Sequence, residues 1–136
     1  MAFKIRFLLT RKCTATCAYC HNEGQSDVGA SLLPFGQIKR ILDRLTQGNR
    51  LPDEIILSGG EPTLHKHLGQ IASLCASTGS HISMDSHGGH PDLLQAALPH
   101  IHELKLHIDS FDADEQRRSM GLDIRRVVKA SAQPKL

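Results

Sequence analysis

Hydrophobic and polar positions follow two different periods along this chain. Four short segments have apolar residues at every second position or in a continuous run: 3–10, 54–58, 81–86 and 103–110. Three segments between them repeat their apolar residues at helical spacing: 34–47, 67–77 and 91–98. The first pattern is typical of strands and the second of amphipathic helices. The chain therefore predicts four strands with a helix between each pair.

The order of these elements predicts the fold class. A strand followed by a helix, repeated along the chain, is the signature of parallel βα units in an α/β fold. Asp112 and Glu115 form a capping pair for a further helix after the fourth strand. At roughly 30 residues per βα unit, 136 residues hold about four units. We expect a single domain over residues 1–136.

Composition excludes some classes of partner. There are 16 basic and 14 acidic residues, one Tyr and no Trp, so neither charge nor base-stacking surface favours nucleic acid. No apolar run approaches the ~20 residues of a membrane span. Lys4 and Arg6 interrupt the N-terminal apolar segment, which is therefore unlike a signal peptide. A cytoplasmic protein is expected, and clustered cysteines there are more often metal ligands than disulfides.

Three cysteines follow the first strand with the spacing Cys13-x₃-Cys17-x₂-Cys20. Thiolates this close on one loop can reach three corners of an iron–sulfur cube and leave its fourth iron open to a ligand. Structural zinc is the alternative, and it needs a fourth ligand. His21 is adjacent to Cys20, and Cys75 lies on the apolar face of a predicted helix, where a free cysteine behaves as a small hydrophobe. The spacing alone leaves zinc open.

A second motif, Ser58-Gly59-Gly60-Glu61-Pro62, follows the second strand. In barrel-like α/β folds the functional loops gather at the carboxyl ends of the strands. Two glycines let the backbone approach a ligand closely, and the Glu61 carboxylate suits an ammonium group. An ordinary strand-to-helix turn with a surface glutamate explains this motif equally well when it is considered alone.

The two motifs together resemble the signatures of the radical S-adenosylmethionine (SAM) superfamily. Tyr19 supplies the aromatic residue before the last cysteine, and Gly59-Gly60-Glu61-Pro62 follows the second strand as it does in that family. The run RFLLTRKCTATCAYCHNEG is most similar to the branch of cyclic pyranopterin monophosphate synthases and peptide-modifying relatives. The resemblance implies a partial (βα) barrel with about four parallel units instead of the usual six.

The resemblance also implies the cofactors and their ligands. Cys13, Cys17 and Cys20 would hold a [4Fe–4S] cluster whose fourth iron binds the methionine moiety of SAM. The Gly59-Gly60-Glu61 turn would hold the methionine amino group, and Tyr19 would face the adenine. Reductive cleavage of SAM would give a 5′-deoxyadenosyl radical that abstracts hydrogen from an unidentified substrate. No other catalytic residue is assigned.

Two positions depart from the family pattern. On the fourth strand the family often has Ser-x-Asp near the SAM ribose, where this chain has His107 and Asp109. After the third strand it often has Thr-Asn-Gly, where this chain has Ser86-His87-Gly88. His87 is expected either to line the active site or to adopt a left-handed turn conformation. Both His107 and Asp109 are carried over as SAM-binding candidates.

The short length leaves alternatives in function and partners. The fourth strand would have an open edge that a second copy or another protein could cover. The expected partners are a small-molecule or peptide substrate and a reducing protein such as flavodoxin or ferredoxin, with neither nucleic acid nor membrane. A non-catalytic cluster- or SAM-binding module is the main alternative to an enzyme, and a structural zinc domain is a third.

Overall fold

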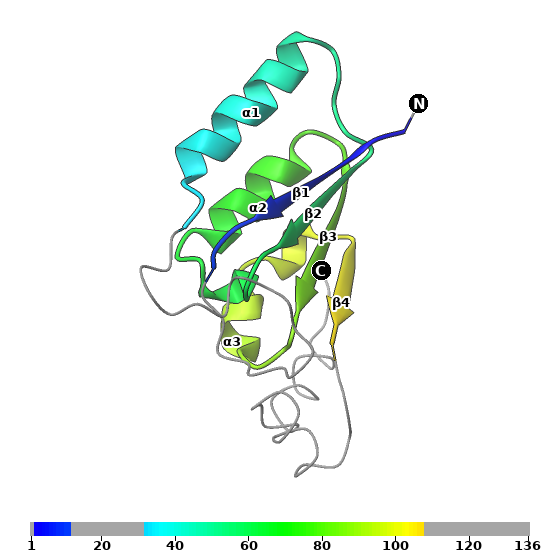
Figure 1. Ribbon diagram of the computed structural model, residues 1–136. Coiled ribbons are helices and arrows are strands. Elements are labelled where there is room, and N and C mark those ends of the chain that lie inside the picture. The colour runs from blue at the N-terminus through cyan, green and yellow to red at the C-terminus, as the bar shows by residue number, and fades with distance from the viewer. Residues whose placement is uncertain (1, 12–31, 108–136) are drawn as a thin grey trace.

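A computed structural model describes residues 2–11 and 32–107 of the chain. It contains four strands: β1 (Lys4–Leu8), β2 (Glu54–Ser58), β3 (His81–Ser86) and β4 (Glu103–Leu106). They form one sheet in the order β1-β2-β3-β4, and every neighbouring pair is parallel. The predicted α/β fold with four parallel strands is confirmed, and all four carboxyl ends lie at the same end of the sheet (Figure 1).

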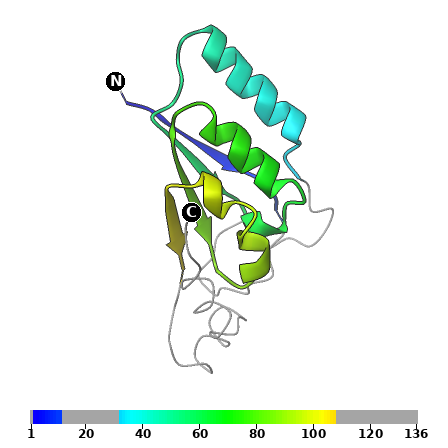
Figure 2. The same cartoon turned by 180° about the vertical axis from the view of Figure 1, so that it is seen from behind.

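The helices cover one face of this sheet. α1 (Phe35–Gln47) and α2 (Leu68–Ala76) follow β1 and β2, and α3 (Pro91–Leu94) and two 3₁₀ turns, η2 (Pro62–Leu64) and η3 (Leu98–His100), complete the connections. Figure 2 shows α1 and α2 in front of the strands, and Figure 1 shows the opposite face, over which no described helix packs. We call this second side the open face.

Strand alternation explains why the helices pack on that side. Phe7 and Leu9, Ile55 and Leu57, and Ile82 and Met84 point toward the helices and are at most 4% exposed. They pack against apolar residues of the helices, among which Ile38, Leu42 and Ile71 are also buried. Polar residues occupy most of the alternate positions on the open face. The period-two pattern of the sequence is therefore the inside–outside pattern of the sheet.

One local prediction needs correction. α1 itself ends as its spacing predicts, with Gly48 (φ −82°) as its C-cap and Asn49 (φ 56°) in the left-handed region. The predicted helix over 91–98 ends at Leu94, and a separate 3₁₀ turn begins at Leu98. The turn between them packs tightly on α2, because a Cβ on Gly69 would lie 3.2 Å from the Ala96 carbonyl oxygen. Tertiary packing has therefore overridden the local helical spacing.

Within the described residues, no helix is long and apolar enough to cross a membrane. The expectation of a single domain over residues 1–136 remains a prediction.

Candidate functional site

The predicted site residues fall into two groups. Cys13, Cys17, Cys20, Tyr19 and Asp109 lie outside the described residues. Within the described part, Gly59, Gly60 and Glu61 follow β2, and His107 follows β4. These described positions are all at the carboxyl ends of parallel strands, the end where α/β folds place their functional loops.

The glycine turn after β2 packs directly against the chain that leaves β1. Gly59 has φ +122°, and a Cβ added to it would lie 2.7 Å from the Thr10 carbonyl oxygen. The Gly60 N–H donates to that same oxygen at 2.7 Å. Thr10 is 2% exposed and stands three positions before Cys13 in the sequence. A side chain at position 59 would therefore push away the backbone that leads into the cysteine segment.

Both ends of the cysteine segment are held at one place. Thr10 and Leu32 form an antiparallel bridge, and the Leu33 N–H donates to the Leu9 carbonyl at 2.8 Å. His65 secures the second end, because its Nε2 lies 2.8 Å from the Leu33 carbonyl oxygen while its Nδ1 accepts from the backbone of His67. Since Nδ1 is an acceptor, the proton of the neutral ring is on Nε2. Burial lowers the pKa of His65, and the hydrogen bond to Leu33 partly opposes that shift.

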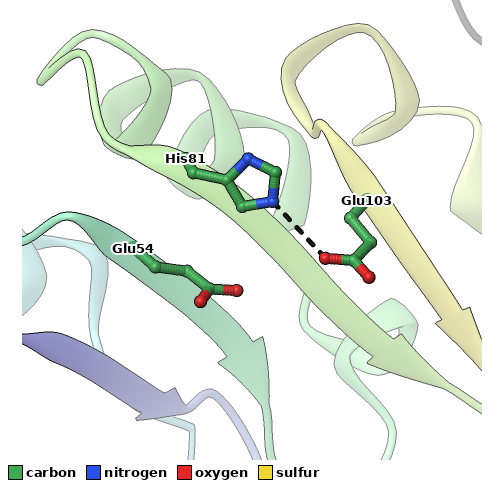
Figure 3. A group of neighbouring side chains, drawn as sticks. All are labelled: Glu54, His81 and Glu103. Atoms are coloured by element: carbon green, nitrogen blue, oxygen red, sulfur yellow. Dashed lines mark hydrogen bonds and ion pairs between the residues drawn. The ribbon is translucent and has the colours of Figure 1, made fainter.

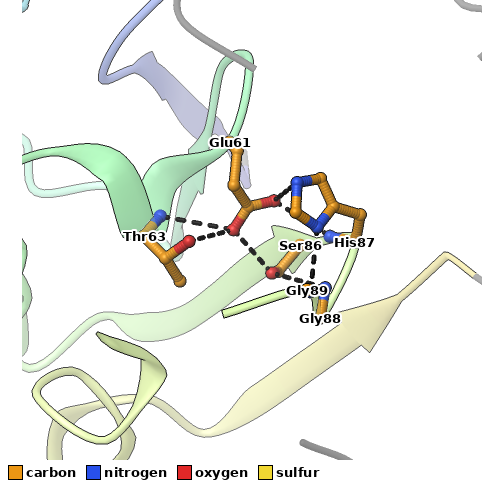
Figure 4. A network of polar contacts seen from close by, with 6 residues as sticks. All are labelled: Glu61, Thr63, Ser86, His87, Gly88 and Gly89. Atoms are coloured by element: carbon orange, nitrogen blue, oxygen red, sulfur yellow. Dashed lines mark hydrogen bonds and ion pairs between the residues drawn. The ribbon is translucent and has the colours of Figure 1, made fainter. Parts of the chain in front are cut away.

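Glu61 is buried, not on the surface, with 1% of its area exposed. Its Oε2 accepts from the Thr63 hydroxyl at 2.5 Å, the Thr63 N–H at 3.3 Å and the Ser86 hydroxyl at 2.7 Å. Its Oε1 accepts from the His87 N–H at 2.9 Å (Figure 4). The reading of Glu61 as an ordinary surface glutamate is wrong. The carboxylate ties the turn after β2 to the end of β3.

His87 belongs to the same network and is 5% exposed. Its Nδ1 accepts from the Gly89 N–H at 2.9 Å, and its Nε2 lies 3.5 Å from Glu61 Oε1 (Figure 4). The left-handed residue of this turn is Gly88, with φ +73°, so the alternative of a left-handed His87 is wrong. Burial lowers the pKa of His87, the Glu61 carboxylate raises it, and the neighbouring His90 lowers it further.

His107 continues from β4 with its N–H donating to the Ser86 carbonyl at 3.1 Å, and the residue is exposed. Its backbone is therefore bonded to the same residue that binds Glu61. Sequence reasoning missed Thr10, Thr63 and His65, and it named Ser86 without its contact to Glu61. Thr63 bonds to Glu61 two residues away, whereas His65 and Ser86 contact partners 32 and 25 residues away in the sequence.

A separate polar group lies at the opposite, amino end of the strands. Potential ligand atoms of Glu54, His81 and Glu103 are all within 4.8 Å of one another (Figure 3). Lys4 pairs with Glu54 at 3.2 Å, and the Ser83 hydroxyl donates to Glu54 at 2.8 Å. His81 Nε2 lies 3.4 Å from Glu103. Since these groups already satisfy one another near solvent, we assign them to a ladder of polar contacts across the four strands.

Comparison with known proteins decides the family. Residues 7–132 match the sequence profile described as the Radical SAM superfamily. The chain belongs to the radical SAM superfamily. Members of this superfamily use a [4Fe–4S] cluster and SAM. This match confirms the membership of the superfamily that the two motifs indicated.

Curated radical SAM relatives match parts of the chain. An S-adenosylmethionine-dependent nucleotide dehydratase of Selenomonas ruminantium is 34% identical over 90 residues, which are 65% of this chain and 31% of that protein. A probable GTP 3′,8-cyclase of Sulfolobus acidocaldarius is 38% identical over 62% of this chain and 26% of its own. A PqqA peptide cyclase of Methylobacterium sp. is 30% identical over 84% of this chain and 30% of its own. The chain thus spans about a third of these relatives.

Solved structures agree with the radical SAM fold. SuiB of Streptococcus suis bound to the precursor peptide SuiA superimposes with a TM-score of 0.78 over 96% of this chain and 29% of that one, at 16% identity. SuiB bound to SAM superimposes with a TM-score of 0.73. At this identity the likeness concerns the fold, and it agrees with the predicted partial barrel.

Proposed function

We propose that this chain forms the cluster- and SAM-binding part of a radical SAM enzyme. Cys13, Cys17 and Cys20 would ligate three irons of a [4Fe–4S] cluster. When bound, the cluster and SAM supply reductive cleavage of SAM and hydrogen abstraction from a substrate. The observation that carries the proposal is the convergence of the glycine turn and both ends of the cysteine segment at the carboxyl end of the sheet.

The described residues fit such a cofactor pair. The Gly60 carbonyl accepts no hydrogen bond from the described residues, so an acceptor is available there for the SAM ammonium group. Gly59, Gly60 and Glu61 would orient this end of SAM, and Tyr19 would face the adenine. His107 and Asp109 would approach the ribose. The chain's own part is to hold the thiolates, orient SAM and keep water away from the reacting atoms.

A peptide substrate is favoured by the charges of the open face. In the described strands its cations are Lys4, Arg6 and Lys105, and its anions are Glu54, Asp85 and Glu103. Lys4 pairs with Glu54 at 3.2 Å and Arg6 with Asp85 at 2.9 Å. A nucleoside triphosphate would need a surplus of positive charge that these strands do not offer. The names of the relatives include both a peptide cyclase and nucleotide enzymes.

Two further partners belong to the proposal. A protein such as flavodoxin or ferredoxin would supply the electron. Among the described strands β4 pairs only with β3, so its outer edge is open to a second copy or to another protein.

Anaerobic reconstitution tests the proposal. Purified protein treated with iron and sulfide should bind about four irons per chain. With dithionite and SAM it should release 5′-deoxyadenosine, and Cys17→Ala should abolish both results. One equivalent of zinc with no iron would contradict the proposal. Equilibrium dialysis against GTP checks the substrate class, because a triphosphate substrate would be retained and a peptide enzyme would not retain it.

A further inference from the structure

The buried pair of Glu61 and His87 is joined by two contacts. The His87 N–H donates to Glu61 Oε1 at 2.9 Å, and His87 Nε2 lies 3.5 Å from the same oxygen. Both side chains are at most 5% exposed. The backbone contact is a hydrogen bond to a charged group and the ring contact is a longer polar contact, and burial strengthens both.

The Glu61 carboxylate has no position left for a ligand. Thr63 and Ser86 bring three donors to Oε2, and His87 brings its N–H and Nε2 to Oε1. A carboxylate offers about four lone-pair sites, and four protein donors already form hydrogen bonds with this one, while His87 Nε2 lies 3.5 Å from Oε1. An ammonium group would therefore have to displace a protein donor in order to bind Glu61 directly.

The state of the His87 ring follows from its other nitrogen. Nδ1 accepts the Gly89 N–H at 2.9 Å, so it carries no proton in this arrangement. The proton of the neutral ring is then on Nε2, which faces Glu61. The Ser86 hydroxyl is used in the same way as the His87 ring, because it accepts from the Gly88 N–H at 3.0 Å and donates to Glu61. Each donor in the turn after β3 thus has an acceptor.

We propose that His87 is a positioning residue for the SAM site. As the neutral Nε2–H tautomer it fixes the Glu61 carboxylate and the turn from β3 to α3, so that the ammonium group of SAM is received by the backbone of the Gly59-Gly60 turn and not by Glu61. This inference rests on the proposed function for its ligand and on the described contacts for the pair itself.

The tautomer can be measured without SAM. Long-range ¹H–¹⁵N correlation spectra of histidine-labelled protein at pH 7.5 should show the buried rings of His65 and His87 each with a bare Nδ1 and a protonated Nε2. His87→Asn should remove one of these two signals and assign it to His87. Glu61→Gln should shift it, because the ring loses its carboxylate partner. A His87 ring with the proton on Nδ1, or with both nitrogens protonated at this pH, would overturn the inference.

Binding of S-adenosylhomocysteine to the reconstituted protein tests the positioning role. Substitution of a residue that orients a metal ligand typically costs about 10–100-fold, and by the same reasoning His87→Ala should weaken binding at least about tenfold. Glu61→Gln should do the same. The double variant should bind within about twofold of the weaker single variant, because the two residues act as one unit. Fully additive losses would contradict this.

Two matched variants make these results specific. His87→Asn keeps an acceptor for the Gly89 N–H but cannot reach Glu61, so it should fold and recover part of the affinity even if His87→Ala does not fold. His100→Ala, on η3 and away from the site, should bind like the wild type. Wild-type affinity in both His87 variants would overturn the inference.

The double variant also separates a clamp from a direct contact. If Glu61 bound the ammonium group directly, Glu61→Gln would weaken S-adenosylhomocysteine binding further in the His87→Ala background, and the inference would be refuted. If the wild type did not bind S-adenosylhomocysteine, the proposed function and the ligand part of this inference would both fail, and the tautomer would still test the pair.

Discussion

Gly59→Ala probes the contact that brings the cysteine segment to the glycine turn. At φ +122° an L side chain is strained, and this costs an alanine about 1–3 kcal/mol. The added Cβ would also lie 2.7 Å from the Thr10 carbonyl oxygen and 3.0 Å from the Leu9 nitrogen. Both atoms are backbone, so no side-chain rotation can relieve the clash.

The chain must then move, and the Gly60 N–H would lose its bond to Thr10, which is worth about 1 kcal/mol. The expected loss of unfolding free energy is about 2–4 kcal/mol, a large part of the ~5–15 kcal/mol typical of a domain. At about 3–5 °C per kcal/mol for a chain of this size, the melting temperature should fall by about 10 °C. Iron incorporation should fall as well, because Thr10 leads into the cysteines.

Circular dichroism melts of the metal-free protein measure this loss, with two glycines as matched controls. Gly79 has φ +85° and nothing within 4 Å of an added Cβ, so Gly79→Ala should cost only the strain, about 1 kcal/mol. Gly36 lies within α1 and also has free space, so Gly36→Ala should stabilise the protein by about 0.5–1 kcal/mol. If Gly59→Ala melts no lower than Gly79→Ala, the close contact with Thr10 is refuted.

Three further predictions concern single side chains. Burial lowers the pKa of His65 and His87, so the unfolded chain takes up protons before the folded protein does as the pH falls below about 6.5. The unfolding free energy should therefore be constant above that pH and decline below it. The urea midpoints at pH 7.5 and 5.5 should differ less in His87→Asn than in the wild type. Burial raises the pKa of Cys75 to about 12, so iodoacetamide should label it only in denatured protein, and labelling in the native state would contradict its place in the core. Arg6→Ala breaks the half-exposed ion pair with Asp85, and chemical denaturation should show a loss of less than about 1 kcal/mol of unfolding free energy. A larger loss would show that Arg6 also supports the open face by packing.

The strands and α1 were predictable because their patterns are local. Alternation in 54–58 and helical spacing in 34–47 each reflect one buried face, and the structure places these elements within a residue of the predicted bounds. The predicted helix over 91–98 was wrong because a distant contact, and not the local pattern, decides its structure. Leu94, Ala97 and Leu98 have helical spacing, but a turn between them packs on Gly69 of α2, and nothing in the local sequence announces that contact.

The site also has features that the local sequence predicts and features that depend on distant contacts. The Gly59-Gly60-Glu61 turn was visible from its residue types and its position after a strand. The burial of Glu61 was not, because it depends on Ser86 and His87, 25 and 26 residues later. His65 carries no signal in the sequence, yet its ring contacts Leu33, 32 residues earlier. Polar residues of this kind acquire their roles from distant partners, which a single sequence does not reveal.

The bridge between Thr10 and Leu32 has a consequence for protein engineering. Because the cysteine segment leaves and rejoins the sheet at adjacent points, the contacts that set the strand register lie outside this segment. We therefore expect residues 12–31 to be exchangeable. A relative's cysteine loop could be transplanted here, or a short hairpin linker substituted, with the remaining α/β frame serving as an unchanged host.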